Sequence, residues 1–330
     1  MSNAGKPFEK AAPQSANAGD RLPAYRVAAV QTAPVFLDRG ATVEKGCRLI
    51  AEVASQGASL AVFPETWLPG YPVWTNADAR WNYGPAKKLY GQLYRNAVDV
   101  PGPAVSRLCE AARQHGVAVV MGIHERTSTG TLYNSIVFID RNGELLGKHR
   151  KLVPTYHERM VWGRGDGSTL SVFDTELGRL GGLVCWEHWM PLARYALYCE
   201  GEQVHAALWP SATETFLLSC RAMAFEGRLF VVAAASYIEK AMLPDDFPLR
   251  REMEGFPDLL CRGGSAVIGP DARFIAGPVY DCETIVYADI DLNRLPEEKQ
   301  LLDVAGHYSR PDVFSLRVNR ARMEPVSPDE

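Results

Sequence analysis

Short apolar runs of strand length alternate with helix-like segments along most of the chain. Runs rich in Val, Ala, Leu and Ile fall at 25–32, 60–63, 117–122, 204–209 and 229–235. Helical periodicity appears between them, at 42–56, 87–98, 105–114, 190–200 and 213–227. Strands that are apolar at nearly every position are typical of a sheet covered by helices, because neither face meets water. The pattern therefore predicts a layered α/β fold.

A hairpin and several shorter strands complete this pattern. Arg141-Asn142-Gly143 lies between two apolar runs, and Asn-Gly is a strong signal for an antiparallel turn. Loops are expected at 151–168 and 237–262. Further strands are expected at 133–140, 144–149, 171–173, 179–184, 265–268 and 284–289, with Pro270-Asp271 as the turn between the last two. No change in composition marks a boundary, so residues 24–303 are expected to form a single domain.

The bulk composition argues against several classes of function. The net charge is −4, and no run of Lys and Arg interleaved with aromatic residues offers a track for nucleic acid. No apolar run approaches the roughly 20 residues that cross a membrane. Residues 1–23 lack the apolar centre of a signal peptide, so a disordered lead or an expression remnant is expected there. Seven cysteines without metal-ligand spacing predict free thiols in a reducing cytoplasm and no metal site.

One of these cysteines occupies a position suited to a nucleophile. Cys185 ends the apolar strand in Gly-Gly-Leu-Val-Cys-Trp-Glu-His and precedes a helix-like segment. A helix N-terminus supplies free backbone N–H groups and partial positive charge, which lower a thiol pKa and stabilise an oxyanion. Cys185 is therefore a candidate nucleophile, although a buried structural cysteine fits this position about equally well.

A nucleophilic thiol needs a base, and carboxylates are available for this role. Glu65 follows the strand at 60–63 and so lies at the carboxyl end of a strand, where functional groups of α/β sheets collect. Lys151 follows the hairpin, and a fixed loop there would aim its ammonium group at developing negative charge. Glu158 either bonds this lysine or pairs with a neighbouring arginine. Taken singly, each residue is more often an ordinary surface charge.

Three long motifs contain these residues together. They read Phe-Pro-Glu65-Thr-Trp-Leu-Pro-Gly-Tyr-Pro, Arg-Lys151-Leu-Val-Pro-Thr-Tyr-His-Glu158-Arg-Met-Val-Trp-Gly and Cys185-Trp-Glu-His-Trp-Met-Pro-Leu-Ala-Arg-Tyr-Ala. In this combination the chain resembles the nitrilases, a branch of the carbon–nitrogen hydrolase superfamily, over nearly its whole ordered length. Trp-Glu-His after the cysteine is similar to nitrilases rather than to amidases or carbamoylases. Segments 71–83 and 209–215 depart from the family pattern, so the substrate's side chain is left open.

The resemblance implies a fold, a catalytic set and an assembly. The implied fold is a four-layer α-β-β-α sandwich. The implied triad is Glu65, Lys151 and Cys185, and Glu158 matches the family's further glutamate beside the lysine. The family also implies a homo-oligomer, a dimer that extends into a spiral filament. The tail at 304–330 agrees with this, because its apolar and aromatic residues need a partner to cover them, unless they pack on their own chain.

Aromatic and imidazole groups near the motifs complete the expected pocket. Tyr71 lies in the loop after Glu65, while Trp186 and Trp189 follow the nucleophile and are expected in the core or on the pocket wall. His188 suggests a Cys–His dyad at first sight. It is better interpreted as a residue whose ring bonds nearby backbone and fixes the turn that holds the cysteine.

The expected reaction is hydrolysis of an organic nitrile without metal or organic cofactor. Cys185 would attack the nitrile carbon to give a thioimidate, while Lys151 and the backbone N–H of Trp186 stabilise charge on the nitrogen. Water would then release ammonia, and the remaining thioester would hydrolyse to the carboxylic acid. Two alternatives remain: the same triad acting on amides or carbamoyl groups, and a catalytically silent oligomerising scaffold.

Overall fold

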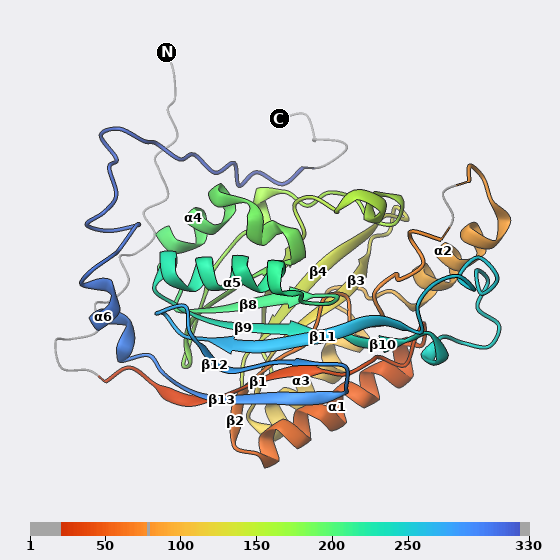
Figure 1. The fold of residues 1–330 in the computed structure, drawn as a ribbon, viewed down its shortest axis with the longest axis horizontal. Coiled ribbons are helices and arrows are strands. Elements are labelled where there is room, and N and C mark those ends of the chain that lie inside the picture. Colours follow the sequence, from red (N-terminus) through yellow and green to blue (C-terminus); the bar gives the residue numbers. More distant parts are fainter. Residues whose placement is uncertain (1–20, 78–79, 324–330) are drawn as a thin grey trace.

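Two β-sheets form the centre of the computed structural model, which describes residues 21–77 and 80–323 (Figure 1). The first sheet has the order β13-β1-β2-β3-β4-β5 and mixes parallel with antiparallel pairs. Its strands are β1 (Ala24–Gln31), β2 (Ala58–Val62), β3 (Ala118–Arg126), β4 (Leu132–Ile139), β5 (Leu145–Arg150) and β13 (Thr284–Asp291).

The second sheet packs face to face on the first. Its order is β10-β11-β9-β8-β7-β6, and β12 pairs with β11 outside this path. Its strands are β6 (Phe173–Thr175), β7 (Gly178–Val184), β8 (Val204–Trp209), β9 (Phe230–Ala235), β10 (Tyr237–Glu239), β11 (Leu259–Ile268) and β12 (Phe274–Tyr280). The central strands β7, β8 and β9 run parallel and are buried along nearly their whole length.

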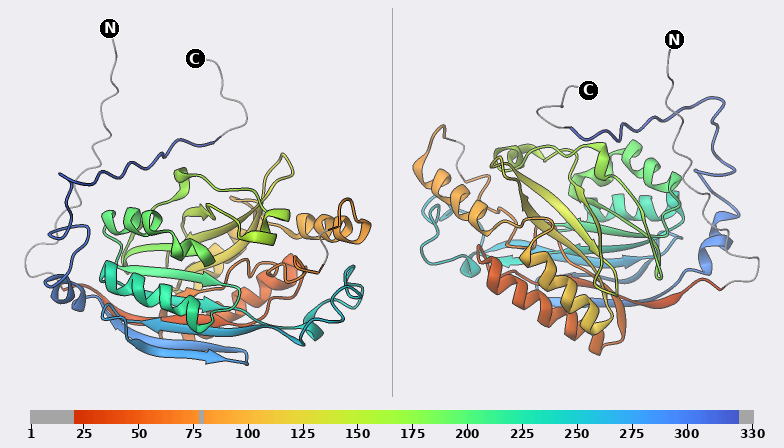
Figure 2. Two further views of the ribbon diagram at one scale, coloured as in Figure 1. Left: turned by 45° about the horizontal axis from the view of Figure 1, so that its top comes forward. Right: turned by 180° about the vertical axis from the view of Figure 1, so that it is seen from behind.

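Helices cover the outer faces of both sheets (Figures 1 and 2). The α-helices are α1 (Arg39–Ser55), α2 (Gly84–Asn96), α3 (Pro103–His115), α4 (Pro191–Cys199), α5 (Glu214–Gly227) and α6 (Arg294–Lys299). Short 3₁₀ helices are η1 (Tyr156–Met160), η2 (Gly167–Thr169), η3 (Cys185–Trp189) and η4 (Lys240–Met242). Helices α1 and α3 lie on the first sheet, while α4 and α5 lie on the second. The four-layer α-β-β-α sandwich is therefore confirmed.

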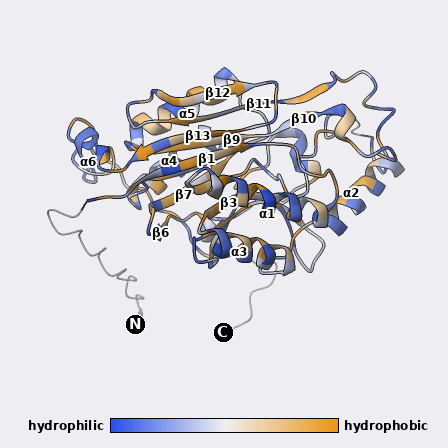
Figure 3. Cartoon of the chain, turned by 90° about the horizontal axis from the view of Figure 1, so that it is seen from below, coloured by the Kyte–Doolittle hydropathy of each residue, from blue (hydrophilic) through white to orange (hydrophobic). Residues whose placement is uncertain are grey.

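Local sequence signals explain the helix boundaries. Helix α1 begins three residues before the predicted start, because the Asp38 carboxylate accepts a hydrogen bond from Ala41 N and caps the first turn. Helix α3 starts at Pro103 and ends at His115, and it is capped by Gly116, whose φ of 64° suits a residue without Cβ. Hydrophilic and hydrophobic residues alternate along both helices in Figure 3, as expected for helices with one face on a sheet.

Three apolar clusters fill the molecule. One lies between the two sheets and under α4 and α5, and a second lies between the first sheet and helices α1 and α3. A third, smaller cluster lies beside the sandwich. It joins α2 to the loops around 71–77 and 243–261 and includes Trp74, Leu89, Trp162, Phe247 and Met253. These loops therefore pack in a cluster of their own, to which Leu132 of β4 and Ile238 of β10 also contribute.

Some strand predictions were wrong at the C-terminal end of the domain. The hairpin at Asn142-Gly143 is confirmed by the antiparallel pair β4 and β5. In contrast, β11 starts at Leu259 and not at 265, and β12 was not predicted. Strand β12 pairs only with β11 and contains Gly277-Pro278, and glycine and proline weaken the strand signal at a sheet edge.

The tail after α6 forms no helix or strand within residues 300–323. It crosses the side of the sandwich that carries α4, where Arg320 pairs with Glu200 and the Met323 N–H donates to Asp166 (Figure 1). The predicted disordered lead at 1–23 falls mostly on residues 1–20, and the end of the tail on 324–330, outside the described residues. Among the described residues, no helix has the length and apolar character needed to cross a membrane.

One glycine lets the loop after β2 lie directly against β3. A Cβ at Gly122 would stand 2.2 Å from the Pro64 carbonyl oxygen and 2.4 Å from the Thr66 nitrogen. Both atoms are backbone and cannot rotate away. The position of the loop that carries Glu65 therefore depends on glycine at 122.

We predict that Gly122→Ala destabilises the protein by about 1–3 kcal/mol, as overpacking does, and displaces Glu65. Denaturant unfolding measures the first effect and activity the second. Gly91→Ala in α2 is the matched control, because the nearest atom to its Cβ is the flexible tip of Arg95 at 3.4 Å. An unchanged unfolding free energy in Gly122→Ala would contradict the prediction.

Candidate active site

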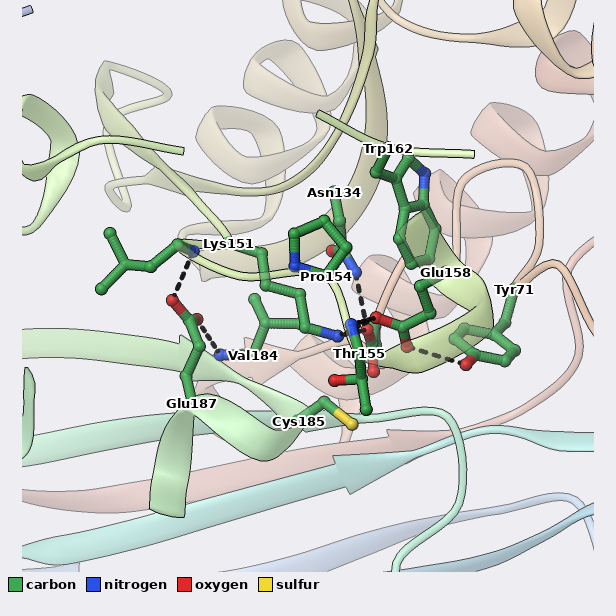
Figure 4. Close-up of polar contacts among 12 residues, drawn as sticks. Tyr71, Asn134, Lys151, Pro154, Thr155, Glu158, Trp162, Val184, Cys185 and Glu187 are labelled. Atoms are coloured by element: carbon green, nitrogen blue, oxygen red, sulfur yellow. Dashed lines mark hydrogen bonds and ion pairs between the residues drawn. The ribbon is translucent and has the colours of Figure 1, made fainter. Parts of the chain in front are cut away.

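Three strand ends converge between the two sheets. Glu65 follows β2 and Lys151 follows β5 in the first sheet, while Cys185 follows β7 in the second. All three side chains are buried, and the Cys185 sulfur lies within 4.8 Å of carboxylate oxygens of Glu65 and Glu158. The structure thus brings together the four residues that the sequence motifs contain. Figure 4 labels three of them, Lys151, Glu158 and Cys185.

A buried ammonium group is the centre of this cluster. Lys151 Nζ lies 2.8 Å from Glu65 Oε1 and 2.6 Å from Glu158 Oε2. It also lies 5.7 Å from the centroid of the Trp162 ring, within the range of a cation–π interaction. The two carboxylates are therefore held on either side of one cation.

Neighbouring donors fix each carboxylate further. Asn134 Nδ2 donates to Glu65 Oε1 at 2.6 Å. The Tyr71 hydroxyl donates to Glu158 Oε1 at 2.8 Å, and the Thr155 N–H donates to Glu158 Oε2 at 2.6 Å (Figure 4). Glu65 Oε2 is buried and has no hydrogen-bond partner. One carboxylate oxygen of the cluster is therefore free to accept a proton.

Burial and charge set the protonation of the cluster. Burial raises the pKa of Glu65 to about 7, and the ammonium of Lys151 offsets part of this effect while Glu158 adds to it. Burial, followed by the charge of Glu65, raises the pKa of Cys185 well above its usual value. Burial alone would lower the pKa of Lys151, but the surrounding acidic groups outweigh it and raise this pKa. Near neutral pH the cluster therefore holds an ammonium, a protonated thiol and a carboxyl group close to its titration point.

Cys185 lies at a tight turn from strand to 3₁₀ helix. Its φ is 55°, in the left-handed region that a residue with a Cβ seldom adopts. The backbone N–H of the next residue, Trp186, lies close to the sulfur and works to lower the pKa of the thiol. A thiol and an N–H donor are therefore aimed at the same space.

A cavity of about 370 Å³ opens above the cysteine. Cys185 and Glu158 belong to its lining, so the buried cluster is accessible to a small molecule. The rest of the lining mixes apolar and uncharged polar groups, namely Tyr71, Val73, Thr75, Asn76, Thr155, Tyr156, His157, Trp186, Pro210, Ser211, Phe216, Phe256, Pro257, Leu260 and Cys261.

The sequence of this sandwich matches a known family of hydrolases. Residues 26–300 match the family model described as carbon–nitrogen hydrolase. The chain belongs to the carbon–nitrogen hydrolase family. It is 41% identical to an aliphatic nitrilase of Rhodococcus rhodochrous, covering 92% of this chain and 85% of the relative. It is 40% identical to the bifunctional nitrilase/nitrile hydratase NIT4B of Nicotiana tabacum, covering 92% and 89%. These relatives place the chain in the nitrilase branch of the family.

Solved structures of the carbon–nitrogen hydrolase family share the fold. A carbon–nitrogen hydrolase from Helicobacter pylori G27 superimposes with a TM-score of 0.67 at 19% identity, covering 84% of this chain and 93% of that one. Saccharomyces cerevisiae Nit3, a member of branch 10 of the nitrilase superfamily, gives a TM-score of 0.67 at 18% identity, covering 86% and 96%. At such identities the likeness concerns the fold alone.

Of the four residues expected around the pocket of this carbon–nitrogen hydrolase, two line the cavity and two do not. Tyr71 and Trp186 line the cavity, and the half-exposed Trp186 ring contacts Phe216 edge-on at its mouth. His188 and Trp189 do not line it. His188 is buried behind the cysteine, where its Nδ1 lies 2.6 Å from the Cys185 carbonyl oxygen. Trp189, the last residue of the 3₁₀ helix η3, is partly exposed.

The sequence analysis did not predict that Glu187 connects the loop after β7 to the loop after β5. Its buried carboxylate accepts from Val184 N at 2.8 Å and Leu152 N at 2.7 Å, and His149 Nε2 lies 3.1 Å away. Burial works against its ionisation, but His149 and the two N–H groups outweigh this and lower its pKa. Glu187 thus joins the turn at Cys185 to the loop that begins at Lys151. Its place in the first turn after Cys185, where acids accept backbone N–H groups, was the available signal.

The cluster also has the residue types of a cation site. Among the residues that the structure describes, Glu65, Glu158 and Cys185 form the group that offers metal-ligand atoms within 4.8 Å of one another. The Lys151 ammonium already lies between the two carboxylates at 2.8 and 2.6 Å. The donor set therefore fits an internal ammonium rather than a resident metal ion.

Proposed function

We propose that the chain hydrolyses an organic nitrile to the carboxylic acid and ammonia, with Cys185 as nucleophile. The observation that carries the proposal is the unpartnered, buried Glu65 Oε2 in the same cluster as a protonated thiol. The other oxygen of Glu65 is held by Lys151 and Asn134. A thiol whose pKa is raised needs such a base to become a nucleophile.

The first half of the reaction forms a thioimidate. Glu65 takes the proton of Cys185, and the sulfur attacks the nitrile carbon. The Lys151 ammonium and the Trp186 N–H stabilise the negative charge that develops on the nitrogen. The nitrogen then takes the proton that Glu65 removed from Cys185, which restores the Glu65 carboxylate. Glu158 stays bound to Lys151 in this step. Its carboxylate is held by Tyr71 and Thr155 and keeps the ammonium charged and in place.

The second half consumes two molecules of water. Glu65 activates the first, which adds to the thioimidate carbon, and the protonated nitrogen leaves as ammonia. The product is a thioester on Cys185. A second water, activated in the same way, breaks the carbon–sulfur bond and gives the carboxylic acid and the free thiol. Each step uses only groups of this cluster, so the scheme needs no cofactor.

Nitriles are favoured over amides because of the relatives. The proteins that are about 40% identical over most of this chain are named nitrilases. The amidase of Nesterenkonia sp. shares the fold at 21% identity, with a TM-score of 0.62, which carries no argument about substrate. The identity of the nitrile is a question for a substrate panel.

The enzyme is further proposed to act as a homo-oligomer, a dimer that extends into a spiral filament, in a reducing cytoplasm. Two observations support this setting. All seven cysteines are free. In the tail, Tyr308 is 65% and Phe314 is 77% exposed, and large exposed apolar groups favour cover by another chain. A head-to-tail contact that does not close produces open helical growth.

We predict that Cys185→Ala releases no ammonia above background from propionitrile, benzonitrile or phenylacetonitrile. Glu65→Gln and Lys151→Ala should each lower kcat by about 10²–10⁴-fold, the usual worth of general acid–base catalysis. Cys199→Ala, an exposed cysteine on α4, is the control and should keep the wild-type rate. The matching amides are assayed in parallel. Faster turnover of the amides would favour an amidase, and full activity of Cys185→Ala would refute the mechanism.

The pH profile should report the base. Because the pKa of Glu65 is about 7 and only its carboxylate accepts the thiol proton, kcat/KM should fall as pH drops through about 7. The negative charge of Glu158 contributes to this raised pKa, so Glu158→Gln should move the acid limb to lower pH while also slowing the reaction. Initial rates from pH 5 to 9 measure both effects. An acid limb that stays in place would show that Glu65 is not the titrating group.

Light scattering during size-exclusion chromatography tests the oligomer. Species larger than the 36.4 kDa monomer are expected, and truncation after Val304 should reduce their size. A fully active monomer would contradict the oligomer. An unchanged size distribution after truncation would exclude the tail as the contact.

A further inference from the structure

A row of buried polar side chains lies behind the nucleophile and ends on its backbone. His188 Nδ1 lies 2.6 Å from the Cys185 carbonyl oxygen, and His188 Nε2 lies 3.0 Å from His205 Nε2. His205 Nδ1 lies 2.7 Å from Glu202 Oε1. All three side chains are buried and none lines the cavity, so the row is inaccessible to substrate. This row is termed the Glu202 chain below.

The hydrogen positions in the Glu202 chain follow from its geometry. A carbonyl oxygen only accepts, so His188 Nδ1 carries a hydrogen and, in a neutral ring, Nε2 accepts. His205 Nε2 must then donate, which leaves His205 Nδ1 as an acceptor. When both rings are neutral, the hydrogen between His205 and Glu202 therefore belongs to Glu202. The glutamate at the start of the chain is an undissociated carboxylic acid.

The opposite arrangement would require two buried charges. An ionised Glu202 would need an imidazolium, at His205 or at His188, to keep every hydrogen bond, and buried ions are costly unless all their polar atoms are paired. Glu202 Oε2 has no hydrogen-bond partner, which suits the carbonyl oxygen of an acid better than a carboxylate. Arg194 Nη1 donates to the His188 carbonyl oxygen and so brings a positive charge close to this ring.

The surrounding charges agree with a Glu202 chain in which none of the three side chains is ionised. Burial raises the pKa of Glu202 well above its usual value, and Glu200 adds to this. Burial lowers the pKa of His188 and of His205 to about 3. The titratable groups that face the two imidazoles from neighbouring elements are Glu187, His149 and Arg194. Their effects of opposite sign do not reverse the effect of burial.

The His188 end of the Glu202 chain holds a peptide group of the active site in place. The Cys185 carbonyl and the Trp186 N–H belong to one planar trans peptide, in which the two groups point in opposite directions. Holding the carbonyl therefore aims the N–H at the sulfur. Cys185, which supplies the carbonyl of this peptide, has the unfavourable φ of 55° and needs such support. The His188 ring is itself held by stacking on Trp209, with centroids 4.8 Å apart.

We propose that Glu202, as a neutral carboxylic acid, acts with His205 and His188 as a set of positioning residues that orients the Cys185–Trp186 peptide for catalysis. The inference rests on the proposed function for its effect on rate, since the Trp186 N–H is assigned there to the nitrile nitrogen. None of the three residues touches substrate. Each acts through the backbone of the nucleophile.

Glutamate-to-glutamine substitutions at Glu202 and at Glu187 test whether Glu202 acts as a neutral hydrogen-bond donor or as a carboxylate. In Glu202→Gln the amide NH₂ donates to His205 Nδ1 as the acid did, so kcat and the pH profile should stay within about threefold of wild type. In Glu187→Gln the new NH₂ would face N–H donors, because the native carboxylate accepts from Val184, Leu152 and His149. That variant should lose at least about 10²-fold in kcat. Loss of activity in a folded Glu202→Gln protein would overturn the proposal.

Removing the donor altogether tests the effect on positioning. Glu202→Leu leaves His205 Nδ1 without a hydrogen-bond donor. We expect kcat to fall by about 10–100-fold with KM nearly unchanged, as misplacement of a catalytic group does. Phenylacetonitrile is the probe, or the panel nitrile that wild type hydrolyses fastest. A wild-type kcat in Glu202→Leu would overturn the proposal. Thermal unfolding identifies a variant that fails to fold, in which case Glu202→Gln and the spectrum below decide.

An infrared spectrum tests the protonation state without any substrate. At neutral pH the wild-type protein should show the carbonyl stretch of an undissociated carboxyl group that is absent from Glu202→Gln. A difference spectrum with only carboxylate bands would overturn the proposal. If wild type hydrolyses no nitrile, the proposed function fails, whereas the infrared band still decides whether Glu202 is the neutral end of this chain.

Discussion

The active site depends on the burial of one ammonium group. Transfer of an ion from water into a protein costs several kcal/mol unless partners compensate for the lost water. Lys151 finds two carboxylates and an aromatic face, and the same contacts fix Glu65 and Glu158 in turn. Removal of any partner would leave a buried charge uncompensated. The strand ends must therefore meet closely, and packing of two sheets face to face holds them there.

Two buried glutamates on either side of Cys185 illustrate how surroundings determine ionisation. Glu187 accepts from two backbone N–H groups and lies beside His149, so it is a carboxylate. Glu202 meets one imidazole nitrogen and has an unpartnered oxygen, so it keeps its proton. One anchors the residue before Cys185, and the other acts on the carbonyl of Cys185 through two histidines. The turn with positive φ is thus held from both sides.

The sequence predicts some levels of this structure better than others. The parallel strands and the hairpin were predictable because continuous apolar runs and Asn-Gly are local signals. Glu65, Lys151, Glu158 and Cys185 were found because they lie in long motifs. Strand β12 was not predictable, since an edge strand with glycine and proline has little apolar alternation. Glu202 and His205 have no signal in the sequence. They lie three residues apart and bond each other, but His188, the other partner of His205, lies on another element, and only the packed structure shows that the three are buried together.

The third apolar cluster separates the pocket wall from the rest of the protein. Tyr71, Val73, Phe256, Leu260 and Cys261 line the cavity and pack in this cluster beside the sandwich. Lys151 and Cys185 instead follow strands of the two sheets. Mutational drift in the two wall segments can therefore reshape the cavity without altering the main cores. For directed evolution this separation suggests where to place libraries: substitutions confined to 73–76 and 256–258 would change the shape of the cavity and leave Tyr71, Glu158, Lys151 and Cys185 unaltered.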